Sequence, residues 1–414
     1  MSTIRGGKMA NRILEAIREG QVFHAHRTYA QKRFFFSTED FEFGFIFFLG
    51  HASHGACTLG EMLYLADQFD ESHPESWISG AIGMADRVES RARTSLRNGH
   101  RISAREGLLR ASFYHRIATA MISPRKDTKV WRDHHERSRA LFQEAAVLFE
   151  PALEYLEIPF EGTMLPGYFR KPNQSDTPRK TLLMIGGGET FAEDLYFYIG
   201  PAAIARGYNF MTVDLPGQGG LPLEGVTFRP DMDTPMKPVV EYLLSRRDVD
   251  PERLAAYGIS GGGYYVPRAA AYDKRIKACV ANSLLYDLDR ILKVSLFQFG
   301  ELFKKHDPMA YRIADMIAWR WGAKSPLSLI AKCKGYVFDP SLITCPTLIL
   351  IGEGEYQGSK EAQRQQHAGL DAIQNPQKKL VIVPLNEGGG QHVLGENLSL
   401  MSQIVFDWLD EVFV

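Results

Sequence analysis

The chain has 414 residues, of which 45% are hydrophobic and 23% are charged, and its formal net charge is -1. This balance, without any long run of Lys and Arg, argues against nucleic acid or an anionic membrane as a partner. The N-terminus lacks the apolar core of a secretory signal, and the most apolar stretch, FEFGFIFFLG, is far shorter than the roughly 20 residues that span a bilayer. We therefore expect a globular, cytoplasmic protein that acts on a small molecule.

Neither a metal nor a cofactor is expected from the sequence. The four cysteines are far apart and form no CxxC pair, so nothing indicates a zinc ribbon or a disulfide scaffold. His51 and His54 have a spacing seen in metal ligands, but no carboxylate pattern accompanies them. The stretch DLPGQGG does not complete the G-x-G-x-x-G pattern of a dinucleotide site, and no Walker lysine motif occurs.

Residues 1–154 are predicted to form an all-helical N-terminal domain. Turn signals are sparse there, and apolar residues recur at three- and four-residue steps, as in the run from Leu108 to Met121. Ser103 and Glu106 have the pattern of a capping box, which predicts a helix start at that point.

After this domain the pattern changes to alternating strands and helices. Residues 156–172 alternate around Glu161-Gly162 and predict a β-hairpin. Short apolar runs then alternate with helical stretches, so residues 155–414 are expected to form a mostly parallel sheet covered by helices on both faces. The active site of such a sheet lies beyond the carboxyl ends of its strands. Residues at about 283–340 interrupt the alternation with a helical, aromatic-rich stretch, which is a candidate cap inserted over that edge.

The stretch YGISGGGYYVPRAAA, from Tyr257 to Ala271, contains the candidate nucleophile. Ser260 fits G-x-S-x-G, follows the predicted strand RLAAYG and precedes a predicted helix, which is the setting of a nucleophile elbow. The alternative is a glycine-rich turn with an incidental serine.

A serine nucleophile needs a base, and the base needs an acid to orient it. Of the 12 histidines, His392 is the one in the required place, after the last predicted strand and before the final helix. In the chain order Ser, acid, His, the acid should follow the strand PTLILIG. We expect Glu355 in this role, with Glu353 as its competitor and Asp339 as an outside candidate.

The oxyanion of the transition state needs two backbone N–H donors. One is expected at Gly261, directly after the nucleophile. The other is expected at Gly188, or its neighbour Gly187, in the glycine-rich loop after the predicted strand TLLMI. A plain tight turn at these glycines is compatible with the same role.

The chain resembles the FrsA-like α/β-hydrolases in the stretches GGGETFAEDLYFYIGPAAIARGYNFMTVDLPGQG, GISGGGYYVPRAAA and GHRISAREGLLRASFYHRIA. Within that family it is similar to 2,6-dihydropseudooxynicotine hydrolase and to fungal pigment hydrolases that shorten polyketides. The resemblance implies an α/β-hydrolase fold and a Ser–His–acid triad that cleaves C–C bonds next to carbonyls, or esters. It carries over to Ser260, His392 and, with glutamate where aspartate is commoner, Glu355. It also implies that Glu189 contacts substrate or assists proton transfer, the alternative being a carboxylate that bonds nearby backbone N–H groups.

The sequence thus predicts a serine-dependent hydrolase that forms an acyl-enzyme from a mid-sized, aromatic or polyketide-like substrate. Aromatic residues of the inserted segment, among them Phe299 and Trp319, are expected to line the substrate pocket, although each could instead pack the two domains together. The same triad suits an esterase, a thioesterase or an acyl-transferring cyclase. A ligand-binding protein on a hydrolase scaffold is the remaining alternative, and the sequence leaves open whether the chain forms a homodimer.

Overall fold

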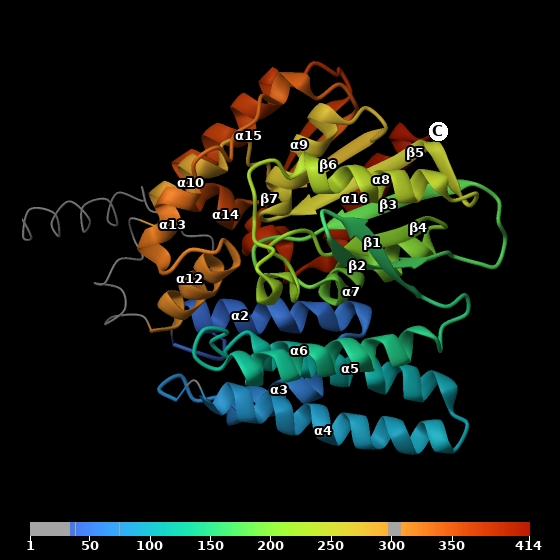
Figure 1. Ribbon diagram of the computed structural model, residues 1–414, viewed down its shortest axis with the longest axis vertical. Coiled ribbons are helices and arrows are strands. Elements are labelled where there is room, and N and C mark those ends of the chain that lie inside the picture. Colours follow the sequence, from blue (N-terminus) through green and yellow to red (C-terminus); the bar gives the residue numbers. More distant parts are fainter. Residues whose placement is uncertain (1–33, 38, 74, 297–307) are drawn as a thin grey trace, which may run out of the picture.

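Figure 1 shows the computed structural model, which describes residues 34–37, 39–73, 75–296 and 308–414. An eight-stranded sheet forms its centre, in the order β1-β2-β4-β3-β5-β6-β7-β8. The strands are β1 (Glu154–Phe160), β2 (Thr163–Arg170), β3 (Arg179–Ile185), β4 (Asn209–Val213), β5 (Val249–Ile259), β6 (Ala278–Asn282), β7 (Thr347–Gly352) and β8 (Lys378–Val383). The β1–β2 and β2–β4 pairs are antiparallel and the other neighbours are parallel, so the prediction of a mostly parallel sheet is confirmed.

The first two strands form a hairpin with a two-residue turn. Phe160 pairs with Thr163, which leaves Glu161 and Gly162 as the turn. Their φ angles are 45° and 83°. Two positive φ values are the requirement of a type I′ turn, whose twist matches that of the flanking strands.

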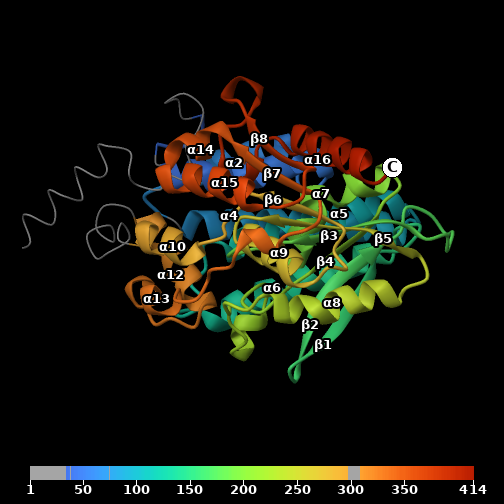
Figure 2. The same cartoon turned by 90° about the horizontal axis from the view of Figure 1, so that it is seen from above.

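The central strands place alternate side chains in two different cores, one on each face of the sheet. In β3, Leu182 and Met184 pack with α7 and α16, whereas Leu183 and Ile185 pack with α8, α9 and α15. Figure 2 shows α7 and α16 on the opposite side of the sheet from α8 and α9. The bounds of these helices are α7 (Ala192–Ala205), α8 (Asp233–Ser245), α9 (Gly262–Tyr272), α15 (Lys360–Ala372) and α16 (Leu398–Val412). The short apolar runs that the sequence shows are therefore the consequence of burial on both faces, because neither set of alternate side chains meets water.

The helical N-terminal region packs beneath α7, on one face of the sheet (Figure 1). Its described helices are α2 (Glu39–Gly50), α3 (Leu59–Gln68), α4 (Glu75–Arg97), α5 (Arg101–Thr119) and α6 (Thr128–Ala146). The expected helix start at Ser103 is wrong, because the N–H of Ala104 already donates to the carbonyl of His100 at 2.9 Å and α5 begins at Arg101. The described ranges contain no helix that is both long enough and apolar enough to cross a membrane.

The segment between β6 and β7 forms helices that reach the N-terminal region. Its described α-helices are α10 (Leu288–Leu296), α12 (Pro308–Arg320) and α13 (Pro326–Lys332). Arg312 of α12 donates to the carbonyl of Met121 at 2.7 Å, and Asp315 accepts from Arg125 at 3.1 Å. The inserted segment and the helical region are thus linked directly at the loop between α5 and α6.

A buried ion pair joins the helical region to the sheet domain. Arg116 of α5 is 5% exposed, and its Nε donates to Oδ2 of Asp194 in α7 at 2.8 Å. Its Nη2 donates to the carbonyl of Glu189 at 2.8 Å, and its guanidinium lies 4.3 Å from the ring centre of Phe191. Through these contacts α5 holds the loop that connects β3 to α7.

Replacing Arg116 by Met should lower the free energy of unfolding by about 3–5 kcal/mol, because Asp194 would keep a buried charge without its partner. Chemical denaturation followed by circular dichroism measures this. Adding Asp194→Asn should recover part of the loss, since the amide oxygen can still accept the N–H of Phe191. The matched control is Lys129→Met, which breaks an exposed ion pair with Asp133 and should cost under about 1 kcal/mol. Equal losses for Arg116→Met and Lys129→Met would contradict this account.

Candidate active site

Ser260 lies at a sharp turn between β5 and α9. The strand ends at Ile259 and the helix begins at Gly262. The φ angle of Ser260 is 53°, in the left-handed region that residues with a side chain rarely adopt. A Cβ on Gly258 would lie 2.0 Å from the carbonyl oxygen of Gly262, so the turn has no room for a side chain there. This is the geometry of a nucleophile elbow, which presents the serine hydroxyl at the carboxyl edge of the sheet.

Ser260, His392 and Glu355 form a continuous chain of polar contacts. Nε2 of His392 lies 2.9 Å from Oγ of Ser260, and Nδ1 lies 3.0 Å from Oε1 of Glu355, within ion-pair distance. His392 begins the short turn η6 (His392–Leu394) after β8, and Glu355 is in α14 (Glu353–Gly358), directly after β7. The structure therefore brings together the three side chains that the sequence named.

The Glu355 carboxylate is buried and surrounded by donors. It is 1% exposed, and it accepts hydrogen bonds from the hydroxyl of Ser283 at 3.1 Å and the N–H of Val393 at 3.2 Å. Burial alone raises the pKa of this carboxyl, but the His392 imidazole and these hydrogen bonds outweigh burial and hold the pKa below its usual value. The carboxylate is therefore ionised at neutral pH. Its contribution to stability is present above the unfolded-state pKa and is lost as pH falls through the lower folded value.

The two other acid candidates are engaged by other groups. Glu353 accepts from the N–H of Leu385 at 2.7 Å and from the side-chain amide of Gln357 at 2.6 Å. Asp339 is exposed and accepts from the N–H of Ser341 at 2.9 Å, at the start of a short turn. Glu355 is the candidate that the fold places beside His392.

The turn that carries His392 is held by residues that sequence reasoning missed. Val393, whose φ is 55°, has its carbonyl bonded by the side-chain amide of Asn282 at 2.9 Å and by the hydroxyl of Tyr198. Asn282 is the last residue of β6, which neighbours the elbow strand β5, and Ser283 follows it directly. A pair of polar residues at the end of an apolar strand was the available signal in the sequence.

The glycine-rich loop after β3 lies against the elbow. A Cβ on Gly187 would lie 2.6 Å from Cβ of Ser260 and 3.1 Å from the backbone nitrogen of Gly261. Gly188 faces Trp321, because a Cβ added to Gly188 would lie 4.0 Å from the ring of Trp321. Among the described residues, the N–H groups of Gly188 and Gly261 donate to no protein acceptor. Gly187 and Gly261 therefore lie beside the nucleophile, and the role of Gly188 and Gly261 as oxyanion donors stays a prediction.

Glu189 is half-buried in the same loop. No described residue donates a hydrogen bond to its carboxylate, so the alternative of a carboxylate bonded to nearby backbone N–H groups is not seen. Burial raises the pKa of Glu189, with a smaller contribution from Asp194, and together they outweigh the opposing effect of Arg116 and Arg320. This carboxyl holds its proton to a higher pH than usual.

The aromatic residues of the inserted segment take different positions. Trp319 packs edge-on against Trp131 of α6, with ring centres 5.4 Å apart, so it joins the inserted segment to the helical region. Trp321 approaches Gly188 and lies over Phe228, with ring centres 4.1 Å apart. Phe299 lies outside the described residues. Substrate contact by Trp319 stays a prediction.

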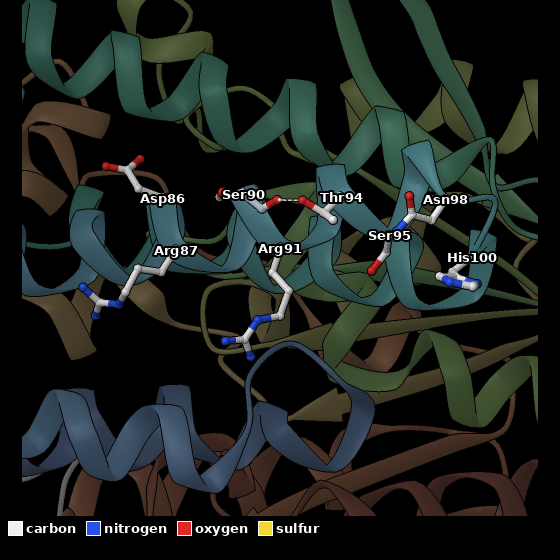
Figure 3. Close-up of a pocket in the computed structure, with 8 residues that line it drawn as sticks. All are labelled: Asp86, Arg87, Ser90, Arg91, Thr94, Ser95, Asn98 and His100. Atoms are coloured by element: carbon white, nitrogen blue, oxygen red, sulfur yellow. Dashed lines mark hydrogen bonds between the residues drawn. The ribbon is translucent and has the colours of Figure 1, made fainter.

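The helical region carries a hollow of about 620 Å³, and the residues that line it are drawn in Figure 3. Its lining is polar and charged and comes from α4 and the turn after it, which form the outer layer of that region in Figure 1. None of its residues belongs to the site at Ser260.

Comparison with known proteins gives consistent matches over most of the chain. The profile of the family described as Esterase FrsA-like matches residues 86–299. Hydrolyase ccsE of Aspergillus clavatus is 30% identical over 423 residues, which cover 90% of this chain and 96% of that protein. Alpha/beta hydrolase pydG of an Acremonium species is 29% identical over 420 residues, which cover 92% and 98% of the two chains.

A solved structure shows the same fold. The crystal structure of 2,6-dihydroxy-pseudo-oxynicotine hydrolase superposes with a TM-score of 0.71 at 22% sequence identity, covering 88% of this chain and 95% of that one. The predicted α/β-hydrolase fold and the FrsA-like resemblance are confirmed.

Glu355→Gln should impair turnover far more than Glu353→Gln. The amide no longer stabilises the imidazolium and favours the wrong tautomer of His392, a loss that reaches about 10⁴-fold in kcat in related triads. Glu353→Gln makes the same substitution two residues earlier in α14 and serves as the matched control. Steady-state kinetics of the two purified variants decide between them, and a larger loss for Glu353→Gln would show that the acid has been misassigned.

Proposed function

The chain belongs to the FrsA-like esterase family, and on that basis we propose that it is a serine-dependent hydrolase that cleaves its substrate through an acyl-enzyme on Ser260. The observation that carries the proposal is the contact chain from Ser260 through His392 to Glu355, with separations of 2.9 and 3.0 Å. This arrangement activates a hydroxyl and stabilises the imidazolium that results.

In the first half-reaction, Oγ of Ser260 attacks the substrate carbonyl carbon while Nε2 of His392 takes the hydroxyl proton. The carbonyl oxygen becomes an oxyanion, which accepts hydrogen bonds from the N–H groups of Gly261 and of Gly188 or Gly187. Collapse of the tetrahedral intermediate breaks the bond to the leaving group, and the proton held by His392 passes to the departing alkoxide directly or to a departing carbanion by way of Glu189, so that both residues regain their starting protonation. In the second half-reaction, His392 takes a proton from water, which attacks the acyl-enzyme, and His392 then returns this proton to Oγ of Ser260 as the carboxylic acid leaves.

Glu189 supports cleavage of a C–C bond next to a carbonyl. A carbanion or enolate leaving group needs a proton donor, whereas a good alkoxide or phenolate leaving group departs without one. The raised pKa of Glu189 and the absence of a described donor to its carboxylate suit a group that gives or shares a proton with the leaving fragment. Plain ester hydrolysis by the same triad is the second candidate.

The surroundings of the nucleophile support hydrolysis of a mid-sized organic substrate with aromatic character. The side chain of His392 is 17% exposed and Ser260 is half-buried, so water can reach the acyl-enzyme. Trp321 and Phe228 supply aromatic surface next to the loop of Gly188. One structural relative is named for the hydrolysis of 2,6-dihydroxy-pseudo-oxynicotine, which supports an organic small molecule as the substrate class.

A fluorophosphonate should label Ser260 in the purified protein, and Ser260→Ala should abolish both labelling and turnover while the protein stays folded. Loss of the nucleophile from a triad costs about 10⁶-fold in kcat, because the remaining residues act only through it. Peptide mapping by mass spectrometry identifies the labelled residue, and circular dichroism checks the fold. Labelling of a different residue, or activity within tenfold of the original chain, would refute the covalent mechanism.

Glu189→Gln should separate C–C cleavage from ester cleavage. With 1-phenyl-1,3-butanedione as a C–C probe, loss of the proton donor should lower kcat by about 10²–10⁴-fold. With p-nitrophenyl butyrate, whose leaving group needs no proton, the change should stay within about tenfold on the same argument.

The C–C activity should also depend on pH through Glu189. It should fall as pH rises through the raised pKa of this carboxyl, since the protonated form donates. Equal losses on both probes would remove Glu189 from the leaving-group step.

A further inference from the structure

The loop after β4 places a buried glutamine against the glycine-rich loop. Gln218, in the stretch DLPGQGG, is fully buried. Its Nε2 donates to the carbonyl of Gly186 at 2.7 Å and to that of Gly187 at 3.1 Å. Its Oε1 accepts from the N–H of Leu215 at 2.9 Å, which fixes the orientation of the amide. One side chain therefore holds two consecutive peptide groups of the loop.

Because the peptide bond is planar, the hydrogen bonds from Gln218 to two carbonyl groups also fix the orientation of the two N–H groups that follow them. In a trans peptide the C=O and the following N–H point in opposite directions. The peptide bonds after Gly186 and Gly187 are trans. Because both carbonyls point to Gln218, the N–H groups of Gly187 and Gly188 point away from it. Gly187 also lies so close to the nucleophile that a Cβ added to it would be 2.6 Å from Cβ of Ser260 and 3.1 Å from the backbone nitrogen of Gly261.

Further contacts hold the carbonyls of the same loop in place. The N–H of Gly219 donates to the carbonyl of Thr190 at 3.2 Å, and Arg116 donates to the carbonyl of Glu189 at 2.8 Å. The loop of Gln218 is itself held by the buried Arg320 of α12, which donates to the carbonyl of Gly217 at 3.0 Å. The glycine-rich loop is thus bound on its carbonyl side by two different parts of the chain.

We propose that Gln218 is a positioning residue that turns the N–H groups of Gly187 and Gly188 towards the oxyanion formed on the substrate attacked by Ser260. This inference rests on the proposed function. Gln218 touches neither the nucleophile nor the substrate in this account and acts through the peptide groups that it holds. Its removal should reduce stabilisation of the transition state rather than binding of the ground state, because the oxyanion exists only after attack.

The test uses two replacements of similar size in the full-length protein. Gln218→Glu keeps the acceptor for Leu215 but loses the donor, and it sets a carboxylate against two carbonyl oxygens. Gln218→Met loses both functions without adding a charge, so it tests the hydrogen bonds of Gln218 to the loop if the first variant folds poorly. The matched control is Gln365→Glu, since Gln365 is also fully buried and its amide bonds the N–H and carbonyl of Asp287.

The readouts are kcat and KM with p-nitrophenyl butyrate, the rate of fluorophosphonate labelling at Ser260, and the thermal midpoint. For both Gln218 variants we expect kcat and the labelling rate to fall by about 10²-fold, the effect of losing one oxyanion donor, with KM within about threefold. Gln365→Glu should lower the thermal midpoint without this loss. Relative to the original chain, Gln218→Glu should regain activity at lower pH, where its new carboxyl is protonated and can donate, and Gln218→Met should not.

The outcomes separate this role from the proposed function. If the original chain is labelled at Ser260 while both Gln218 variants keep kcat within threefold, or change KM alone, the positioning role of Gln218 is refuted and the serine mechanism stands. If the original chain is not labelled at Ser260, the proposed function fails and the role of Gln218 fails with it.

Discussion

The left-handed backbone of Ser260 is the constraint to which the surrounding structure conforms. Such a conformation costs on the order of 1–3 kcal/mol for a residue with a side chain, and it persists only where neighbouring segments leave no alternative. Here the segments after β3 and β6 press on the turn from adjacent strands, since the sheet order is β3-β5-β6. A Cβ on Gly263 would lie 1.7 Å from the carbonyl of Ser283, and one on Gly187 would lie 2.6 Å from Cβ of Ser260. The same close contacts that force the turn also bring the glycine-rich loop to the nucleophile, together with Ser283, whose hydroxyl bonds Glu355.

The pKa values of two glutamates, Glu355 and Glu189, are shifted in opposite directions, and the difference arises from their neighbours. Burial acts on both in the same direction. Glu355 is surrounded by the imidazole of His392 and by neutral donors, which hold its pKa down, whereas Glu189 keeps a raised pKa despite Arg116 and Arg320. Divergent pKa values within one site are how an enzyme obtains an ionised group and a proton donor at the same pH. The proposed division of roles between the two carboxyls follows from this electrostatic difference.

The helical region and the inserted segment extend the site beyond the sheet. Arg116 connects α5 to the loop of Glu189, and Arg320 at the end of α12 connects the inserted segment to the loop of Gln218. Arg116 precedes Ser260 in the sequence and Arg320 follows it. A shift of either segment would therefore be transmitted to backbone carbonyls next to the nucleophile, because interiors packed at native density do not absorb such shifts locally.

The sequence by itself determined the features that depend on local pattern and chain order. Short apolar runs between helical stretches predicted the sheet covered on both faces, and the glycines around Ser260 predicted the strand–turn–helix. The order of the segments pointed to His392 and Glu355. These features were predictable because periodicity and turn chemistry act over a few residues. The start of α5 at Arg101 was missed, since helix ends depend on which backbone groups find partners. Only the tertiary structure decided which of two glutamates in one short helix meets the imidazole, and that Ser283, Asn282 and Gln218 support the site. Those contacts join residues far apart in the chain, and the order of strands in the sheet, which no local pattern encodes, brings them together.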